Sequence, residues 1–211
     1  MNALFKGIPV QLGKKFKFSE IPGEFRKRDL TPSFELLERA NIVYKVTRSA
    51  AQGIPLGAQI EGNDFKAILL DVALSQTLLG LNLGFWLTNP LEQFINKGNI
   101  VEAFIGQELI AYEDPIKQAE LFYWTREKAG SEVEVDFVMQ QRETIIPIEV
   151  KSGKGTTLKS MNMFLESHTH APYGIRFSTN NYSIHQKIYS YPLFAVAYAI
   201  MQDKRAVHAL L

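Results

Sequence analysis

Hydrophobic and β-branched residues are concentrated in three short runs in the second half of the chain. Spacing and residue type predict β-strands over Leu121–Thr125, Val133–Met139 and Thr144–Lys151. The links between them, residues 129–131 and 140–143, are short and polar, which favours antiparallel hairpins. The pattern therefore predicts a small antiparallel sheet in this part of the chain.

Other stretches predict helices and further strands around this sheet. Residues 99–112 place apolar side chains at the spacing of a buried helix face: Val101, Phe104, Ile105, Leu109 and Tyr112. Shorter patterns predict helices at residues 71–79, 91–96, 156–167 and 192–201, and strands at residues 65–70, 173–178 and 184–189. The expected fold class is α/β, with a central mixed β-sheet flanked by helices.

The N-terminal residues predict a smaller helical unit. Ser19 is a plausible N-cap for a helix that reaches Lys27, and Thr31-Pro32 predicts the start of a second helix that ends at Ala40. A strand over residues 42–46 completes the outline of a winged helix. Two interpretations of its basic residues stay open, DNA contact and a solvated basic face. We expect a winged-helix-like unit and connector in residues 1–62 and the main domain in residues 63–211.

Composition narrows the class of protein. The chain has 211 residues, of which 46% are hydrophobic and 21% charged, typical of a globular protein. A net charge of +1 gives no overall attraction to nucleic acid, so any DNA contact must use local patches. The chain has no cysteine, no apolar run of membrane-spanning length and no export signal, so we expect a cytoplasmic protein with no membrane contact. No Walker A sequence is present, so an ATP site of that kind is not expected.

Three polar residues of the predicted hairpin suggest chemistry. Asp136 lies on one strand, Glu149 and Lys151 lie on the next, and a turn near Arg142 would bring them to one end of the sheet. Neighbouring carboxylates repel unless a cation pairs with them, and their oxygens suit Mg²⁺ or Mn²⁺. A lysine beside them can orient or help deprotonate a water. The alternative is an ordinary surface charge pair.

The helix predicted over residues 99–112 adds a further acid. Glu108 completes its apolar stripe, where a carboxylate costs free energy unless a metal or a cation pairs with it. Glu102 lies about 120° away around the helix, at the edge of the stripe. We therefore expect Glu108 to be the better candidate for a third metal ligand, with a snorkelling side chain as the alternative.

The pairs Val135-Asp136 and Glu149-Val150-Lys151 resemble the PD-(D/E)XK, or restriction-endonuclease-like, signature. More broadly, the chain is similar from Ser33 to Ile200 to an uncharacterised prokaryotic domain that follows an AAA-type P-loop ATPase domain. The segments that carry this resemblance include SFELLERANIVYKV, FKAILLDVAL, GNIVEAFIGQEL, LFYWTREKAGSEVEVDFV, IPIEVKSG and YPLFAVAYAI. The resemblance implies a nuclease-like fold preceded by a winged helix.

By the same resemblance, five residues are carried over as site candidates: Glu102, Glu108, Asp136, Glu149 and Lys151. The partners it implies are DNA and a P-loop ATPase domain, which would make the chain a C-terminal part of an ATPase-associated protein. The expected function is Mg²⁺-dependent hydrolysis of DNA, with Asp136, Glu149 and Lys151 catalytic and Glu108, Asp136 and Glu149 binding the metal. The alternative is a catalytically silent module that mediates DNA or protein interaction for the ATPase. The sequence does not decide the oligomeric state.

Overall fold

The computed structural model describes residues 1–80, 98–113, 116, 118–128, 131–152 and 158–201. Within these residues an eight-stranded sheet has the order β2-β1-β3-β4-β5-β6-β8-β7. Its strands are β1 (Val43–Ser49), β2 (Ile60–Leu69), β3 (Leu121–Lys128), β4 (Ser131–Gln141), β5 (Thr144–Lys151), β6 (Gly174–Ser178), β7 (Ser183–His185) and β8 (Ile188–Pro192). Four neighbouring pairs are antiparallel and three are parallel, so the predicted mixed sheet is confirmed.

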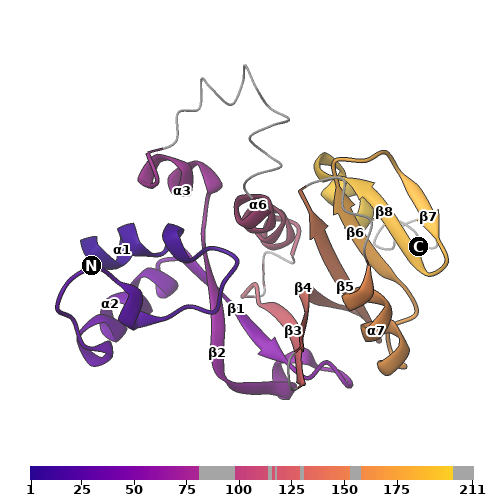
Figure 1. Ribbon diagram of the computed structural model, residues 1–211, viewed down its shortest axis with the longest axis horizontal. Helices are drawn as coiled ribbons and strands as arrows, with labels where there is room; N and C mark the ends of the chain where they lie inside the picture. The colour runs from indigo at the N-terminus through magenta and orange to yellow at the C-terminus, as the bar shows by residue number, and fades with distance from the viewer. Residues whose placement is uncertain (81–97, 114–115, 117, 129–130, 153–157, 202–211) are drawn as a thin grey trace.

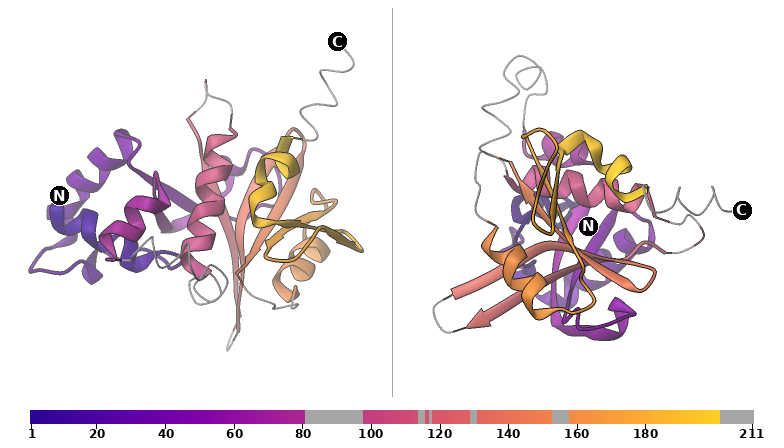
Figure 2. Two further views of the ribbon diagram at one scale, coloured as in Figure 1. Left: turned by 90° about the horizontal axis from the view of Figure 1, so that it is seen from above. Right: turned by 90° about the vertical axis from the view of Figure 1, so that its right-hand side faces the viewer.

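Helices cover both faces of the sheet (Figures 1 and 2). Those with printed bounds are α1 (Asn2–Gly7), α2 (Lys27–Arg39), α3 (Val72–Leu78), α6 (Gly98–Ala111) and α7 (Lys159–Ser167), with 3₁₀ turns at Pro9–Gln11, Phe18–Glu20, Leu56–Gln59 and Leu193–Ala195. Residues 196–201 form a further short helix. Of the helices in these ranges, none combines the length and the apolar character that spanning a lipid bilayer requires.

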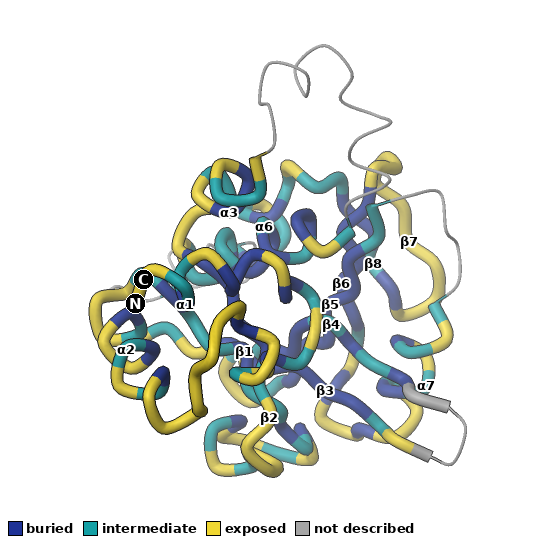
Figure 3. The backbone as a smooth tube through the Cα atoms, turned by 60° about the vertical axis from the view of Figure 1, so that its left-hand side comes forward, coloured by how far each residue is buried: buried dark blue, intermediate teal, exposed yellow. Residues whose placement is uncertain are grey.

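Two hydrophobic clusters lie on opposite faces of the sheet. Helix α6 and residues 196–201 pack on one face, against alternate residues of β5 such as Ile146 and Ile148. Helix α7 packs on the other face, where Phe164 joins Ile145 and Trp124. Because successive strand residues point to opposite faces, one strand serves both clusters. Figure 3 shows the middle strands β4, β5 and β6 largely buried, as this two-sided packing requires.

Strand β4 contains an irregularity at Asp136. Phe122 and Trp124 of β3 are two residues apart, but their partners Val138 and Val135 are three residues apart. The extra residue makes a β-bulge, which is why Val135 and Val138 belong to the same hydrophobic cluster despite their odd spacing. Bulges re-aim side chains, and this one lies where the sequence places its candidate acid.

The N-terminal part joins the same sheet. β1 pairs antiparallel with β2 and parallel with β3, through partners such as Val46 and Leu121. The boundary expected between residues 62 and 63 falls inside β2. Helices α1 and α2 pack on β1 and β2 through a cluster rich in phenylalanine, including Phe16 and Phe34 with ring centroids 5.3 Å apart.

Two features of the predicted winged helix are wrong. The α-helix expected from Ser19 to Lys27 is not formed, because a 3₁₀ turn at Phe18–Glu20 is followed by bends around Pro22-Gly23. The second helix begins at Lys27, and its first turn is capped by Asp29, whose Oδ2 accepts a hydrogen bond from the Arg26 N–H at 3.0 Å. Pro32 consequently lies inside the helix, on its exposed side, instead of starting it.

Most of the remaining helices and strands lie close to the bounds predicted from the sequence. Helix α6 and strand β5 have nearly the expected bounds, and Asp71 caps α3 by accepting a hydrogen bond from Ala73 N–H at 2.7 Å. The weak strand expected at residues 184–189 is two strands, β7 and β8, joined at Gln186 with φ of 51°. The helix expected at residues 91–96 lies outside the described residues.

Gly106 allows α6 to approach the sheet closely. A Cβ atom at this position would lie 2.9 Å from both Ile68 Cδ1 and Phe137 Cζ. We expect Gly106→Leu to lower the free energy of unfolding by about 1–3 kcal/mol, because the larger side chain has no space in this packed layer. Urea denaturation followed by tryptophan fluorescence measures the change. The exposed Ala111→Leu on the same helix is the control, and equal stability of the two variants would contradict the packing argument.

Candidate functional site

The hairpin of β4 and β5 brings Asp136, Glu149 and Lys151 together. The register of the two strands places Asp136 next to Glu149. Asp136 Oδ2 accepts a hydrogen bond from the Val150 N–H at 2.7 Å, and Lys151 Nζ forms an ion pair with Glu149 Oε1. The turn between the strands contains Arg142 with φ of 54°, close to the centre expected from the sequence.

Burial and mutual repulsion perturb these acids. Burial, with the charge of Glu149, raises the pKa of Asp136 to about 7, and this rise is opposed by the charge of Lys66 and the Val150 N–H. Burial also raises the pKa of Glu149, although Lys151 opposes that rise. Burial lowers the pKa of Lys151, but the contact with Glu149 outweighs it and raises that pKa above its ordinary value. Glu149 Oε2 is buried and has no hydrogen-bond partner among the described residues.

Lys66 of β2 is the buried cation of the group. Its side chain is only 2% exposed, and its Nζ lies 2.8 Å from Glu102 Oε1 and 2.5 Å from Glu134 Oε1. The same Nζ lies 5.2 Å from the ring centroid of Tyr123, within the range of a cation–π contact. Burial lowers the pKa of Lys66, but the surrounding carboxylates outweigh this effect and raise the pKa above its ordinary value. The ammonium group therefore stays charged at neutral pH.

Helix α6 contributes Glu102 to this group and not Glu108. Burial raises the pKa of Glu102, and Lys66 opposes that rise. Glu108 lies beside Tyr112 instead and raises the pKa of that phenol. Six residues along a helix correspond to a rotation of about 120°, so the two acids cannot point in one direction. The structure thus brings Glu102, at the edge of the stripe, to Lys66, whereas metal binding by Glu108 stays a prediction.

The donor set fits a divalent cation at one place. Asp136 and Glu149 offer adjacent carboxylate oxygens, one of them buried and unpartnered, and Mg²⁺ is often held by one or two carboxylates with water completing its shell. Among the described residues no group of three or more His, Cys, Asp or Glu side chains could hold a metal ion. Lys66 explains part of this, because it already occupies Glu102 and Glu134.

Residues 97–195 match the domain of unknown function DUF4143. This uncharacterised family is often found with AAA ATPases. Residues 1–83 match a second domain of unknown function, DUF8612. Neither the curated proteins nor the solved structures contain a match to the chain. We call these six residues the carboxylate cluster: Lys66, Glu102, Glu134, Asp136, Glu149 and Lys151. Lys66 lies in the DUF8612 segment, and the four acids and Lys151 lie in the DUF4143 segment, so the cluster is built from both.

A cleft adjoins the cluster at the junction of the two segments. It has a volume of about 480 Å³ and is lined by Gly13, Lys14, Lys15, Lys17, Glu20 and Glu134. Glu134, from the DUF4143 segment, is also a partner of Lys66, so the cleft and the cluster share this residue. Basic side chains thus stand at the edge of an acidic group.

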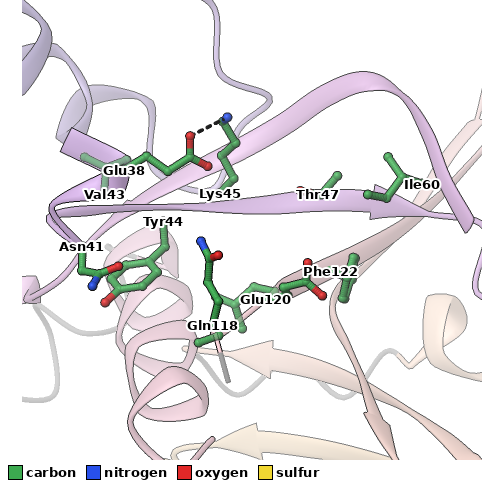
Figure 4. Close-up of a pocket in the computed structure, with 12 residues that line it drawn as sticks. Glu38, Asn41, Val43, Tyr44, Lys45, Thr47, Ile60, Gln118, Glu120 and Phe122 are labelled. Carbon is green, nitrogen blue, oxygen red and sulfur yellow. Dashed lines mark hydrogen bonds and ion pairs between the residues drawn. The ribbon is translucent and has the colours of Figure 1, made fainter. Parts of the chain in front are cut away.

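A second cavity, of about 120 Å³, lies beside β1 (Figure 4). Its polar side chains include Asn41, Tyr44, Gln118 and Glu120, and its Glu38 and Lys45 form an ion pair at 2.7 Å. None of the residues in the carboxylate cluster lines it. We therefore locate the candidate site at the cluster and not in this cavity.

Sequence reasoning missed Lys66 and Glu134. Lys66 interrupts the apolar strand Phe65–Leu69, and a charged residue in such a run is a signal that something pairs with it. Its partners are 36 and 68 residues away along the chain, so no local spacing reveals them. Glu134 alternates with valines and is indistinguishable from an exposed strand residue until β2 is placed.

Proposed function

We propose that the chain is a metal-dependent nuclease that hydrolyses phosphodiester bonds of DNA, and that it works as part of an ATPase-associated protein. The observation that carries the proposal is the adjacency of Asp136 and Glu149 in a buried position, with Lys151 paired to Glu149. Two carboxylates held together with raised pKa values are typical of functional sites. The PD-(D/E)XK fold belongs to the same proposal, supported by a hairpin that carries the acid on one strand and Glu-x-Lys on the next.

Each residue has a role in this proposal. Asp136 and Glu149 would hold Mg²⁺ or Mn²⁺, which when bound lowers the pKa of a water and offsets phosphate charge. Lys151 would orient the attacking water by donating a hydrogen bond to it and would offset phosphate charge, since its ammonium group is kept in place by Glu149. Lys66 would hold Glu102 and Glu134 beside Asp136 without mutual repulsion.

A second candidate is a catalytically silent module that docks DNA or another protein to the ATPase. The observation that favours it is Lys66, which already supplies a cation to two of the four acids. In this case Lys66 would pair with Glu102 and Glu134, Lys151 would pair with Glu149, and the acids would need no metal. The two candidates differ in whether Asp136 and Glu149 bind a divalent cation.

Cleavage of supercoiled and branched DNA in Mg²⁺ or Mn²⁺ tests the nuclease. We expect metal-dependent nicking that EDTA abolishes and that Lys151→Ala lowers by about 10²–10³-fold, because a positioned cation that donates hydrogen bonds is lost. Lys159→Ala, an exposed lysine at the start of α7, is the control and should cut like the wild type.

Calorimetric titration with Mn²⁺ separates the two candidates. Binding by the wild type that Glu149→Gln abolishes would support the nuclease. A folded wild type that binds no Mn²⁺ and cuts no DNA in the presence of its ATPase would instead support the docking module.

A further inference from the structure

The cleft beside the carboxylate cluster is formed by a short basic loop. We name residues 13–17, Gly13-Lys14-Lys15-Phe16-Lys17, the lysine loop. All three of its lysines line the cleft, together with Glu20 and Glu134. No residue of this loop belongs to the hairpin that carries the candidate acids.

The lysine loop is fixed to the edge of the sheet. Its backbone forms an isolated antiparallel bridge between Lys15 and Lys66, and the Phe16 N–H donates to the Phe65 carbonyl at 2.8 Å. The buried Gln11 side chain clamps the next residue, because its Oε1 accepts from the Lys17 N–H at 2.8 Å and its Nε2 donates to the Lys17 carbonyl at 3.1 Å. The loop is thus positioned before any ligand arrives.

The start of the loop lies against the helix that carries Glu102. Gly13 adopts a φ of +69°, a conformation that glycine tolerates at no steric cost. A Cβ atom there would lie 2.8 Å from Asn99 Oδ1 and 3.1 Å from Glu102 Oε2. This close approach places the start of the loop against Glu102, one of the acids of the cluster.

Two lysines of the loop form ion pairs near the protein surface. Lys15 Nζ lies 2.6 Å from Glu127, and Lys17 Nζ lies 3.2 Å from Glu20. All four side chains are between 30% and 64% exposed, and such surface ion pairs contribute little free energy. A phosphate group can therefore replace Glu20 beside Lys17 at small cost.

We propose that the lysine loop binds the sugar-phosphate backbone of a nucleic acid and leads it along the cleft to Asp136 and Glu149. The proposal rests on the proposed function, since it names the surface that holds the substrate of that site. Three lysines at the edge of an acidic group favour the approach of a phosphate chain, which the carboxylates alone would repel. The DUF8612 segment thereby supplies substrate binding and the DUF4143 segment supplies the reactive acids.

Fluorescence anisotropy in EDTA tests the loop without requiring cleavage. The probes are labelled single-stranded DNA, duplex DNA and duplex RNA, which identify the kind of backbone preferred. We expect the triple variant K14Q/K15Q/K17Q to bind at least about ten-fold more weakly at low salt. The slope of log K against log salt should fall by about 2–3, because each phosphate contact contributes about 0.9 on duplex DNA.

The control replaces three exposed cations that do not line the cleft, Lys6, Arg39 and Lys187, by glutamine. It has the same net charge as the triple variant and should bind like the wild type. Lys14→Glu is a second variant that leaves both ion pairs of the loop intact, and it should weaken binding in a protein with an unchanged circular dichroism spectrum.

Each outcome decides one proposal. Equal affinity of the loop variant and the control variant for the nucleic-acid probes, or absence of binding by the wild type, would overturn the role of the loop. Binding that depends on the loop, in a protein that never cuts DNA, would support the loop and overturn the nuclease. Cleavage of DNA by a protein whose DNA binding does not depend on the loop would support the nuclease and overturn the role of the loop.

Discussion

Lys66→Met is expected to lower the free energy of unfolding by about 3–5 kcal/mol, since removing one partner of a buried ion pair leaves its charges uncompensated. The Lys66 side chain is 2% exposed and contacts Glu102 and Glu134 at 2.8 and 2.5 Å. Methionine keeps the length of the side chain but supplies no charge. Urea denaturation at neutral pH measures the loss, which should shrink as the pH falls, because burial raises the pKa of Glu102 and the variant lacks the lysine that opposes this rise.

Two variants control this measurement. Lys15→Met removes a lysine whose side chain is 30% exposed and whose partner Glu127 is 55% exposed, and it should cost much less stability than Lys66→Met. The triple variant K66M/E102Q/E134Q removes the stranded charges and should recover much of the loss. A triple variant no more stable than Lys66→Met would show that packing around the lysine, and not its charge, holds the site together.

Asp136→Asn is expected to abolish metal-dependent cleavage, with a loss of about a thousand-fold or more, because a neutral amide is a poor ligand for a hard cation. The amide oxygen can still accept the hydrogen bond from the Val150 N–H. The variant should therefore fold like the wild type, and the loss should appear in cleavage and in Mn²⁺ affinity. Asp71→Asn, which keeps a good helix cap far along the chain from the site, is the matched control and should retain full activity.

The same variant should change how stability depends on pH. The pKa of Asp136 is about 7 in the folded chain, against an ordinary value of 3.8. An acid whose pKa is raised by folding stabilises the fold below its unfolded pKa, and that stability is lost as the pH rises through the folded pKa. Melting temperature should accordingly fall between about pH 4 and pH 7 in the wild type. A fall of the same size in Asp136→Asn would assign this pH dependence to another group.

Local pattern was enough to predict the elements that carry the candidate acids. The alternation around Val135, the β-branched run of β5 and the stripe of α6 each repeat over several residues, and the structure places strands and a helix there. The hairpin then follows, because a short link allows few other arrangements. Asp136, Glu149 and Lys151 could be brought together from the sequence for this reason.

Contacts between residues far apart in the chain could not be predicted from these local patterns. The choice between Glu102 and Glu108 depends on which side of α6 meets β2, and that is decided by Gly106 and by Lys66. In the N-terminal part, Thr31-Pro32 is a good local start for a helix, yet tertiary packing of Leu30 and the cap at Asp29 extend α2 by a further turn. Local propensity is a weak guide wherever such contacts compete with it.

The pairing of β1 with β3 makes residues 97–195 dependent on residues 1–83. A gene that retained residues 97–195 without residues 1–83 would encode a sheet with β3 as a bare edge, and exposed edges recruit other chains. The same product would carry Glu102 and Glu134 with no ammonium group between them. Residues 97–195 would therefore need both a strand against β3 and a cation between the two acids from another source in order to keep this fold.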